Sequence, residues 1–266
     1  MEQKNMVPEY RKKVSALYSV GQGKYLLADS ISARIYPASV TKLLCACTAL
    51  QFLSPDDVIT VGDEYHLIDE HSSLALVFPG YRVYLKDLLA GALLSSGCDA
   101  AYTIAAAAAM AAFPDREMNA LQAVECFVSL MNEYAGKIGM NDSRFVTPDG
   151  QDDEGQYVTA ADLIKLGVHA LNIPAIRETT VLSNKITDIV SGEHLVWLTT
   201  NLMRDTGSEY YLPDCIGLKT GTTTGAGSGF LGAFERGGDT YISFVSGNDT
   251  RVETFERTMN MLKEYT

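Results

Sequence analysis

Apolar residues follow two different rhythms along the 266-residue chain. Residues 14–20 and 24–28 are apolar-rich runs on either side of the turn residues 21–23, a pattern typical of a β-hairpin. Residues 39–53 are almost continuously apolar, and Pro37 stands just before them, where the start of a helix tolerates a missing N–H group. We therefore predict an early hairpin followed by a long buried helix.

The middle of the chain is predicted to be mainly helical and its last third mainly β. Helical patterns cover residues 85–94, 99–112, 116–138 and 159–171, with short strands at 58–61 and 74–78. Mixed signals over residues 174–203 favour a short helix, an irregular strand and another short helix. Strands at 217–221, 228–235 and 240–245 precede a terminal helix over 250–265.

These elements predict a single domain over residues 1–266 of the α+β class. The sheet subdomain is assembled from both ends of the chain, at about 1–57 and 175–266. A mainly helical subdomain at about 58–174 is inserted after the first helix.

Charge and hydropathy exclude two classes of partner. Thirty-three acidic residues against 21 basic ones give a net charge of −12, which argues against a nucleic-acid partner because phosphate binding needs a basic surface. The sequence has no apolar stretch of about 18 uncharged residues, so we expect no transmembrane segment. Residues 1–13 also lack the apolar core of a signal peptide.

The cysteines and histidines follow no metal-binding pattern. The five cysteines include neither a CxxC pair nor Cys/His ligand spacing, so we predict no metal site and no cofactor. We also expect a fold that does not depend on disulfides.

Three short motifs carry candidate chemistry. Ser39 and Lys42 lie three residues apart on one face of the predicted helix, in its first turns, so the amine of Lys42 is expected to reach the Ser39 hydroxyl. That spacing alone is common by chance. The second motif, Ser96-Gly97-Cys98, lies in a turn between two predicted helices, and the third, Lys219-Thr220-Gly221, lies on a predicted strand. This ordered set is the arrangement of penicillin-binding proteins and class A β-lactamases.

The sequence resembles the serine-type D-alanyl-D-alanine carboxypeptidases, the low-molecular-mass penicillin-binding proteins, over nearly its full length. Residues 86–89 resemble the lead-in to the second motif, and residues 145–150 with Tyr157 and Thr159 resemble the Pro-x-Gly loop of that family. The resemblance implies an antiparallel sheet flanked by helices, an inserted all-helical subdomain and a site between the two.

The resemblance also implies acyl transfer through a covalent ester on Ser39. Ser39 would attack the carbonyl between the last two D-alanines of a peptidoglycan stem pentapeptide. Lys42, kept neutral by burial and by the nearby charge of Lys219, would be the base. Ser96 would relay the proton to the leaving amine, and the backbone N–H groups of Ser39 and Thr222 would form the oxyanion hole.

Further residues would bind the substrate. By resemblance, Lys219 and Thr220 would hold the terminal carboxylate and Gly221 would keep the strand clear for the substrate backbone. Arg251 is a candidate second ligand for that carboxylate because a guanidinium suits it; the alternative is a solvated arginine near the start of a helix.

Cys98 departs from the family, which usually has asparagine at this position. A thiol donates and accepts hydrogen bonds weakly, so we expect a change in catalytic efficiency or in the way the peptide is held. The alternatives are a tolerated small replacement and a second nucleophile.

Several functions share these motifs. β-Lactam antibiotics are expected to acylate Ser39 as inhibitors, and the sequence shows no convincing match to the loop glutamate of class A β-lactamases, so rapid penicillin turnover is not expected. A DD-transpeptidase would use the same acyl-enzyme with an amine in place of water. A non-catalytic β-lactam or peptidoglycan-binding module is supported only by Cys98.

The resemblance implies a location outside the cytoplasmic membrane, in the cell envelope or secreted. Because the sequence has no export signal, we expect Met1 to begin a trimmed chain.

Overall fold

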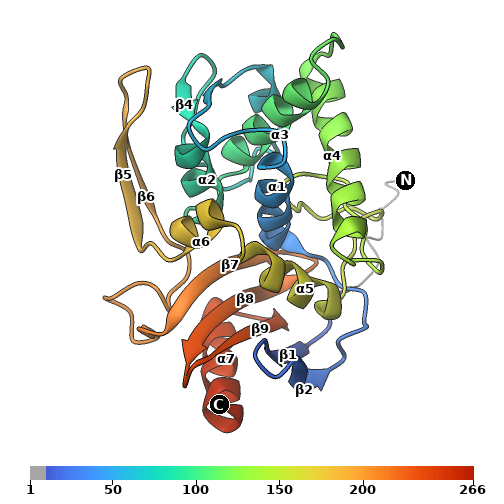
Figure 1. Cartoon of the computed structure of the whole chain (residues 1–266), viewed down its shortest axis with the longest axis vertical. Helices are drawn as coiled ribbons and strands as arrows, with labels where there is room; N and C mark the ends of the chain where they lie inside the picture. The colour runs from blue at the N-terminus through green and yellow to red at the C-terminus, as the bar shows by residue number, and fades with distance from the viewer. Residues whose placement is uncertain (1–9) are drawn as a thin grey trace, which may run out of the picture.

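The computed structural model describes residues 10–266, and within that range five strands form an antiparallel sheet in the order β2-β1-β9-β8-β7. The strands are β1 (Val14–Ser19), β2 (Lys24–Asp29), β7 (Cys215–Thr223), β8 (Gly227–Arg236) and β9 (Asp239–Asn248). The predicted hairpin is therefore present as β1 and β2, and β1 pairs with β9 near the other end of the chain. The α+β class is confirmed, and β7 lies at one edge of the sheet (Figure 1).

Both faces of the sheet are covered by helices. α7 (Arg251–Tyr265) packs on β8 and β9, and α5 (Ala160–Ala170) packs on β1, β8 and β9. Alternate residues of β8 enter different cores, as the two-residue period of a strand requires. Phe230 and Phe234 pack with α7, whereas Leu231 and Ala233 join the larger core that contains the central helices.

The remaining helices surround α1 (Thr41–Ala49). They are α2 (Leu85–Leu93), α3 (Cys98–Ala112), α4 (Ala120–Lys137) and α6 (Pro174–Thr180). Figure 1 shows α1 at the centre of this region, with its first turn directed toward the sheet. The short 3-10 helix η1 (Ala38–Val40), which precedes α1, contacts β7. This contact brings the start of α1 to the edge of the sheet.

One predicted helix is shorter than expected and one predicted strand is wrong. The helix predicted over 39–53 is divided into η1 and the shorter α1. Residues 74–78 form no strand, because the N–H groups of Ala75 and Val77 donate to the Asp99 carboxylate at 2.7 and 3.0 Å instead of pairing with another strand. The strand that pairs with β3 (Val58–Thr60) is β4 (Arg82–Tyr84).

The region from 174 to 203 also differs from its prediction. After α6, β5 (Asn184–Asp188) and β6 (His194–Leu198) form a hairpin, where an irregular strand and a second short helix were expected. Figure 1 shows this hairpin projecting beside α2.

The division into two subdomains stays a prediction. Its first residues, 1–9, lie outside the described residues, and α5, which falls in the predicted helical part, packs on the sheet. No helix within residues 10–266 combines the length and the apolar character needed to cross a membrane.

Candidate active site

Ser39 lies in η1, at the start of the central helix. The preceding residue, Ala38, has φ 48°, in the left-handed region that L-residues seldom adopt. Lys42, which is only 1% exposed, donates from Nζ to Ser39 Oγ at 2.8 Å and to the backbone oxygen of Asp149 at 3.1 Å. The predicted contact between amine and hydroxyl is confirmed, although Ser39 precedes α1 rather than lying in its first turn.

The second motif lies in the turn between α2 and α3. Ser96 is buried and has φ 65°, again in the left-handed region, and Cys98 is the first residue of α3. Two hydrogen bonds tie this turn to a distant loop: Ser73 Oγ donates to the Ser96 carbonyl at 2.9 Å, and the Cys98 N–H donates to the Ser73 carbonyl at 2.8 Å. The loop around Ser73 therefore forms part of the site wall.

Cys98 is enclosed by polar groups. Burial raises the pKa of its thiol, and the nearby charge of Lys42 opposes that rise. The negative charge of the neighbouring Asp149 carboxylate raises the pKa of the thiol further. The thiol consequently stays protonated at neutral pH, which makes it a poor nucleophile.

The third motif lies on β7 and is also buried. Lys219 is 0% exposed, and its Nζ donates to the Thr220 carbonyl at 3.0 Å. Burial, followed by the charge of Lys42, lowers the pKa of Lys219 well below its ordinary value. The two lysines thus lie close enough for the charge of Lys42 to disfavour protonation of Lys219. The predicted neutrality of Lys42 stays a prediction.

Gly221 allows β7 to pass close to η1. A Cβ at this position would lie 3.0 Å from both the Ala38 Cβ and the Ser39 nitrogen, and 3.3 Å from the Val40 nitrogen. Any larger residue would push the strand away from the Ser39 turn. Glycine here therefore fixes the spacing between the first and third motifs.

A cavity of about 270 Å³ opens over these elements. Ten residues line it: Ser39, His71, Ser72, Ser73, Cys98, Asp149, Gly150, Gln151, Thr222 and Thr223. Of the predicted site residues, the cavity brings together the nucleophile candidate, Cys98 and Thr222. Lys42 lies just beneath it, through its hydrogen bond to Ser39. Within residues 10–266 no three His, Cys, Asp or Glu side chains are grouped so that they could hold a metal ion.

Arg251 lies at the start of α7, outside the cavity lining. Its guanidinium is exposed and donates to the Thr200 carbonyl. Thr200 in turn shares a hydrogen bond of 2.6 Å between hydroxyls with Thr220. Arg251 is thus connected to the third motif through one residue, and its proposed role as a carboxylate ligand stays a prediction.

The structure adds two groups that sequence reasoning missed. One is the loop of residues 71–73, which carries no periodic pattern that would place it at the site. The other is the Asp149 side chain, which is 3% exposed and lines the cavity beside Cys98. The only signal for Asp149 was its place in the Pro-x-Gly loop, which does not show where its carboxylate points.

Comparison with known sequences gives a consistent result. The sequence profile of the D-alanyl-D-alanine carboxypeptidases, peptidase family S11, matches residues 2–250. D-alanyl-D-alanine carboxypeptidase DacC of Escherichia coli K12 is 30% identical over 275 residues, which cover 98% of this chain and 62% of DacC. The chain therefore spans only about three-fifths of the length of that relative.

Solved structures agree with the sequence comparison. A serine-to-alanine variant of the Streptomyces K15 DD-transpeptidase matches with a TM-score of 0.83 at 25% identity, covering 95% of this chain and 96% of the other. The ampicillin-bound penicillin-binding protein D2 of Listeria monocytogenes matches with a TM-score of 0.74 at 26% identity, with the same coverage. Among the solved variants of the K15 enzyme are replacements of a cysteine by asparagine and by alanine.

Proposed function

The chain belongs to the D-alanyl-D-alanine carboxypeptidase family, and on that premise we propose that it removes the terminal D-alanine from peptidoglycan stem pentapeptides through an acyl-enzyme on Ser39. The observation that carries the proposal is the 2.8 Å hydrogen bond from the buried Lys42 amine to the Ser39 hydroxyl. A nucleophile paired with a buried base is what acyl transfer requires.

In the first step, the Ser39 oxygen bonds to the carbonyl carbon between the two D-alanines. Lys42 takes the hydroxyl proton, and the C–N bond breaks after Ser96 passes a proton to the leaving amine. The N–H groups of Ser39 and Thr222 stabilise the oxyanion. They suit this role because β7 passes so close to η1 at Gly221.

The terminal carboxylate of the substrate is assigned to Lys219 and Thr220. A carboxylate favours the charged form of a neighbouring lysine, whereas burial favours the neutral form of Lys219 in the free protein. Substrate binding is therefore expected to draw a proton onto Lys219. Arg251 is proposed as the outer ligand of the same carboxylate, reached through the Thr200–Thr220 pair.

Penicillin tests the acyl-enzyme directly. A β-lactam opens its ring when Ser39 attacks and keeps its leaving amine attached, so the adduct is expected to persist long enough for intact-protein mass spectrometry. Wild type incubated with benzylpenicillin should gain the mass of one drug molecule, and Ser39→Ala should gain none. An unmodified wild type, or a modified Ser39→Ala, contradicts the proposal.

A DD-transpeptidase is the second candidate. It is favoured by the match to the Streptomyces K15 DD-transpeptidase. Structures of that enzyme include cysteine variants, and this chain has a cysteine, Cys98, in the lining of its cavity. Diacetyl-L-Lys-D-Ala-D-Ala supplied with and without an amine acceptor distinguishes the two. Free D-alanine with a shortened peptide indicates hydrolysis, and a peptide joined to the acceptor indicates transfer.

A non-catalytic binding module is the weakest candidate, because only Cys98 supports it. It predicts penicillin acylation without release or transfer of D-alanine. In either catalytic case the substrate places the protein in the cell envelope or outside the cell, and fractionation of the source cells tests that location.

A further inference from the structure

The loop of residues 147–156 is held rigidly against the site. The Asp152 carboxylate accepts from the Thr223 hydroxyl at 2.6 Å and from the Gly225 N–H at 2.7 Å, which ties the loop to the end of β7. At the other side, Gly150 has φ 92°, and a Cβ there would lie 1.8 Å from the Ala38 carbonyl oxygen. Only glycine permits this approach, so the backbone on either side of Asp149 has one position.

This anchoring places the Asp149 carboxylate in the cavity that contains Ser39. One carboxylate oxygen accepts from the Gln151 N–H at 3.2 Å, and the carboxylate lies near enough to the Cys98 thiol to raise the pKa of that thiol. No described Lys, Arg or His forms an ion pair with it within 4.0 Å. Asp149 is 3% exposed, and burial of a carboxylate without a cation lowers stability, which points to a use in the reaction.

We propose that Asp149 is the general base that activates the water which hydrolyses the Ser39 acyl-enzyme; this inference rests on the proposed function. A water in the cavity gives one proton to the Asp149 carboxylate as its oxygen bonds to the acyl carbon. The bond between that carbon and Ser39 Oγ then breaks. The proton then returns from Asp149 across the cavity to Ser39 Oγ, so the products are the free acid and the restored hydroxyl.

The groups around Asp149 are consistent with separate bases for water and for Ser39. Lys42 donates to the Ser39 hydroxyl and to the backbone oxygen of Asp149, so its amine lies between the nucleophile and the loop that carries the carboxylate. Burial raises the pKa of the Cys98 thiol, so this neighbour of the carboxylate stays protonated and does not compete for the water proton. Water activation is then separate from Ser39 activation, which Lys42 provides.

The test separates acylation from hydrolysis with an ester substrate, diacetyl-L-Lys-D-Ala-D-lactate. A burst of D-lactate measures formation of the acyl-enzyme, and the steady rate that follows measures its hydrolysis. In Asp149→Asn the burst rate is expected to stay within about 3-fold of wild type, while the steady rate falls by about 10²- to 10⁴-fold, the usual range for loss of a general base. Acyl-enzyme should accumulate in the mass spectrum of the variant.

Chemical rescue distinguishes a base from a merely structural carboxylate. Formate added to Asp149→Ala should raise the steady rate at least about 10-fold without changing the burst, because it supplies a carboxylate to the emptied place. Glu154→Gln is the matched control: it removes one negative charge from an exposed position of the same loop, and both phases should match wild type. Circular dichroism melting verifies that each variant is folded.

The outcomes separate this inference from the proposed function. A wild type that shows neither a burst nor a penicillin adduct overturns the acyl-enzyme and this inference together. A wild-type burst with an unchanged steady rate in Asp149→Asn overturns only the role of Asp149. An equal loss of both phases, or no rescue by formate, shows a structural carboxylate and also overturns the inference.

Discussion

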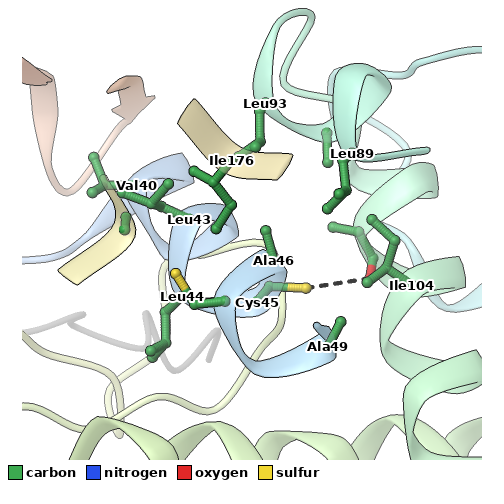
Figure 2. Close-up of a cluster of buried hydrophobic side chains, with 14 of the residues drawn as sticks. Val40, Leu43, Leu44, Cys45, Ala46, Ala49, Leu89, Leu93, Ile104 and Ile176 are labelled. Atoms are coloured by element: carbon green, nitrogen blue, oxygen red, sulfur yellow. Dashed lines mark hydrogen bonds between the residues drawn. The ribbon is translucent and has the colours of Figure 1, made fainter. Parts of the chain in front are cut away.

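The start of α1 and its body are one turn apart, yet their side chains have different surroundings. The body, residues 43–49, is fully buried among apolar side chains of α2, α3 and α6, and Figure 2 shows Leu89, Leu93, Ile104 and Ile176 arranged around it. The one side-chain polar contact drawn there is from the Cys45 thiol to the Ala101 carbonyl, at 3.7 Å.

The start of the same helix holds groups that are costly to bury. Lys42 is nearly inaccessible, as is Lys219 on the neighbouring strand β7, Ala38 in η1 has a left-handed backbone, and the Thr41 hydroxyl has no hydrogen-bond partner among the described residues. Such features lower stability. The body of α1 therefore supplies the packing energy that keeps Ser39 and Lys42 in place, and the two regions should respond oppositely to substitution.

The largest expected effect is on chemistry, at the start of the helix. Lys42→Met keeps most of the side-chain volume and removes the amine, so penicillin acylation should slow by about 10²- to 10⁴-fold. The free energy of unfolding should stay equal or increase, because a buried amine is removed. Rates of adduct formation and urea unfolding curves measure the two quantities. Normal acylation in this variant would remove Lys42 from the mechanism.

The next effect is on stability, in the body of the helix. Leu44 is 0% exposed, and Leu44→Ala should lower the free energy of unfolding by about 2 to 5 kcal/mol through lost burial and a residual cavity. The folded fraction should still acylate at the wild-type rate. Leu198→Ala, at a position that is 64% exposed, is the control and should change stability by less than about 0.5 kcal/mol. If fully folded Leu44→Ala protein acylates much more slowly than wild type, the body of α1 affects the chemistry as well as the stability, which contradicts this prediction.

The body of α1 and the contact between Ser39 and Lys42 were predictable from the sequence because both depend on local spacing. A three-residue interval brings Lys42 to Ser39 whether that turn is α-helical or 3-10, so the contact was predictable although the helix boundary was not. The predicted hairpin likewise needed only a short-range pattern, and it is present as β1 and β2.

The rest of the site depends on contacts between distant segments. Residues 74–78 looked like a strand, but the Asp99 carboxylate captures their N–H groups, and the Trp197 indole donates to the Ala75 carbonyl at 2.7 Å. Those contacts set the course of the loop that brings residues 71–73 to the cavity. Asp149 is placed by Gly150 against Ala38, more than 100 residues away in the chain. Neither arrangement has a periodicity that a sequence can display.

A pH series sharpens the comparison at the second buried lysine. Between the lowered pKa of Lys219 and its ordinary value of 10.5, the unfolded chain binds one proton more than the folded chain. Wild-type stability therefore rises with pH in this window through Lys219, by up to about 1.4 kcal/mol per pH unit. Lys219→Met lacks this contribution, so it should be more stable than wild type at pH 7, and the difference should shrink toward pH 10.5.

The control for the pH series is Lys24→Met, which removes an exposed lysine from β2. Its urea unfolding free energy should follow the wild-type profile in parallel at every pH. If the difference between Lys219→Met and wild type stays constant or widens with rising pH, Lys219 is protonated in the folded state and the account of its burial is wrong.

The smallest expected effect is at Cys98, the first residue of α3, which lines the same cavity as Ser39. An asparagine amide is a stronger donor and acceptor than a thiol, and one better hydrogen bond to the substrate is worth about 0.5 to 1.5 kcal/mol. Cys98→Asn should therefore raise the acylation rate with diacetyl-L-Lys-D-Ala-D-Ala by about 2- to 10-fold. Cys98→Ala, which removes the hydrogen-bonding group, should not share the gain. If both variants acylate at the wild-type rate, the side chain of residue 98 makes no hydrogen bond to the peptide that affects acylation. The polar contacts of the second motif with the substrate would then be limited to Ser96.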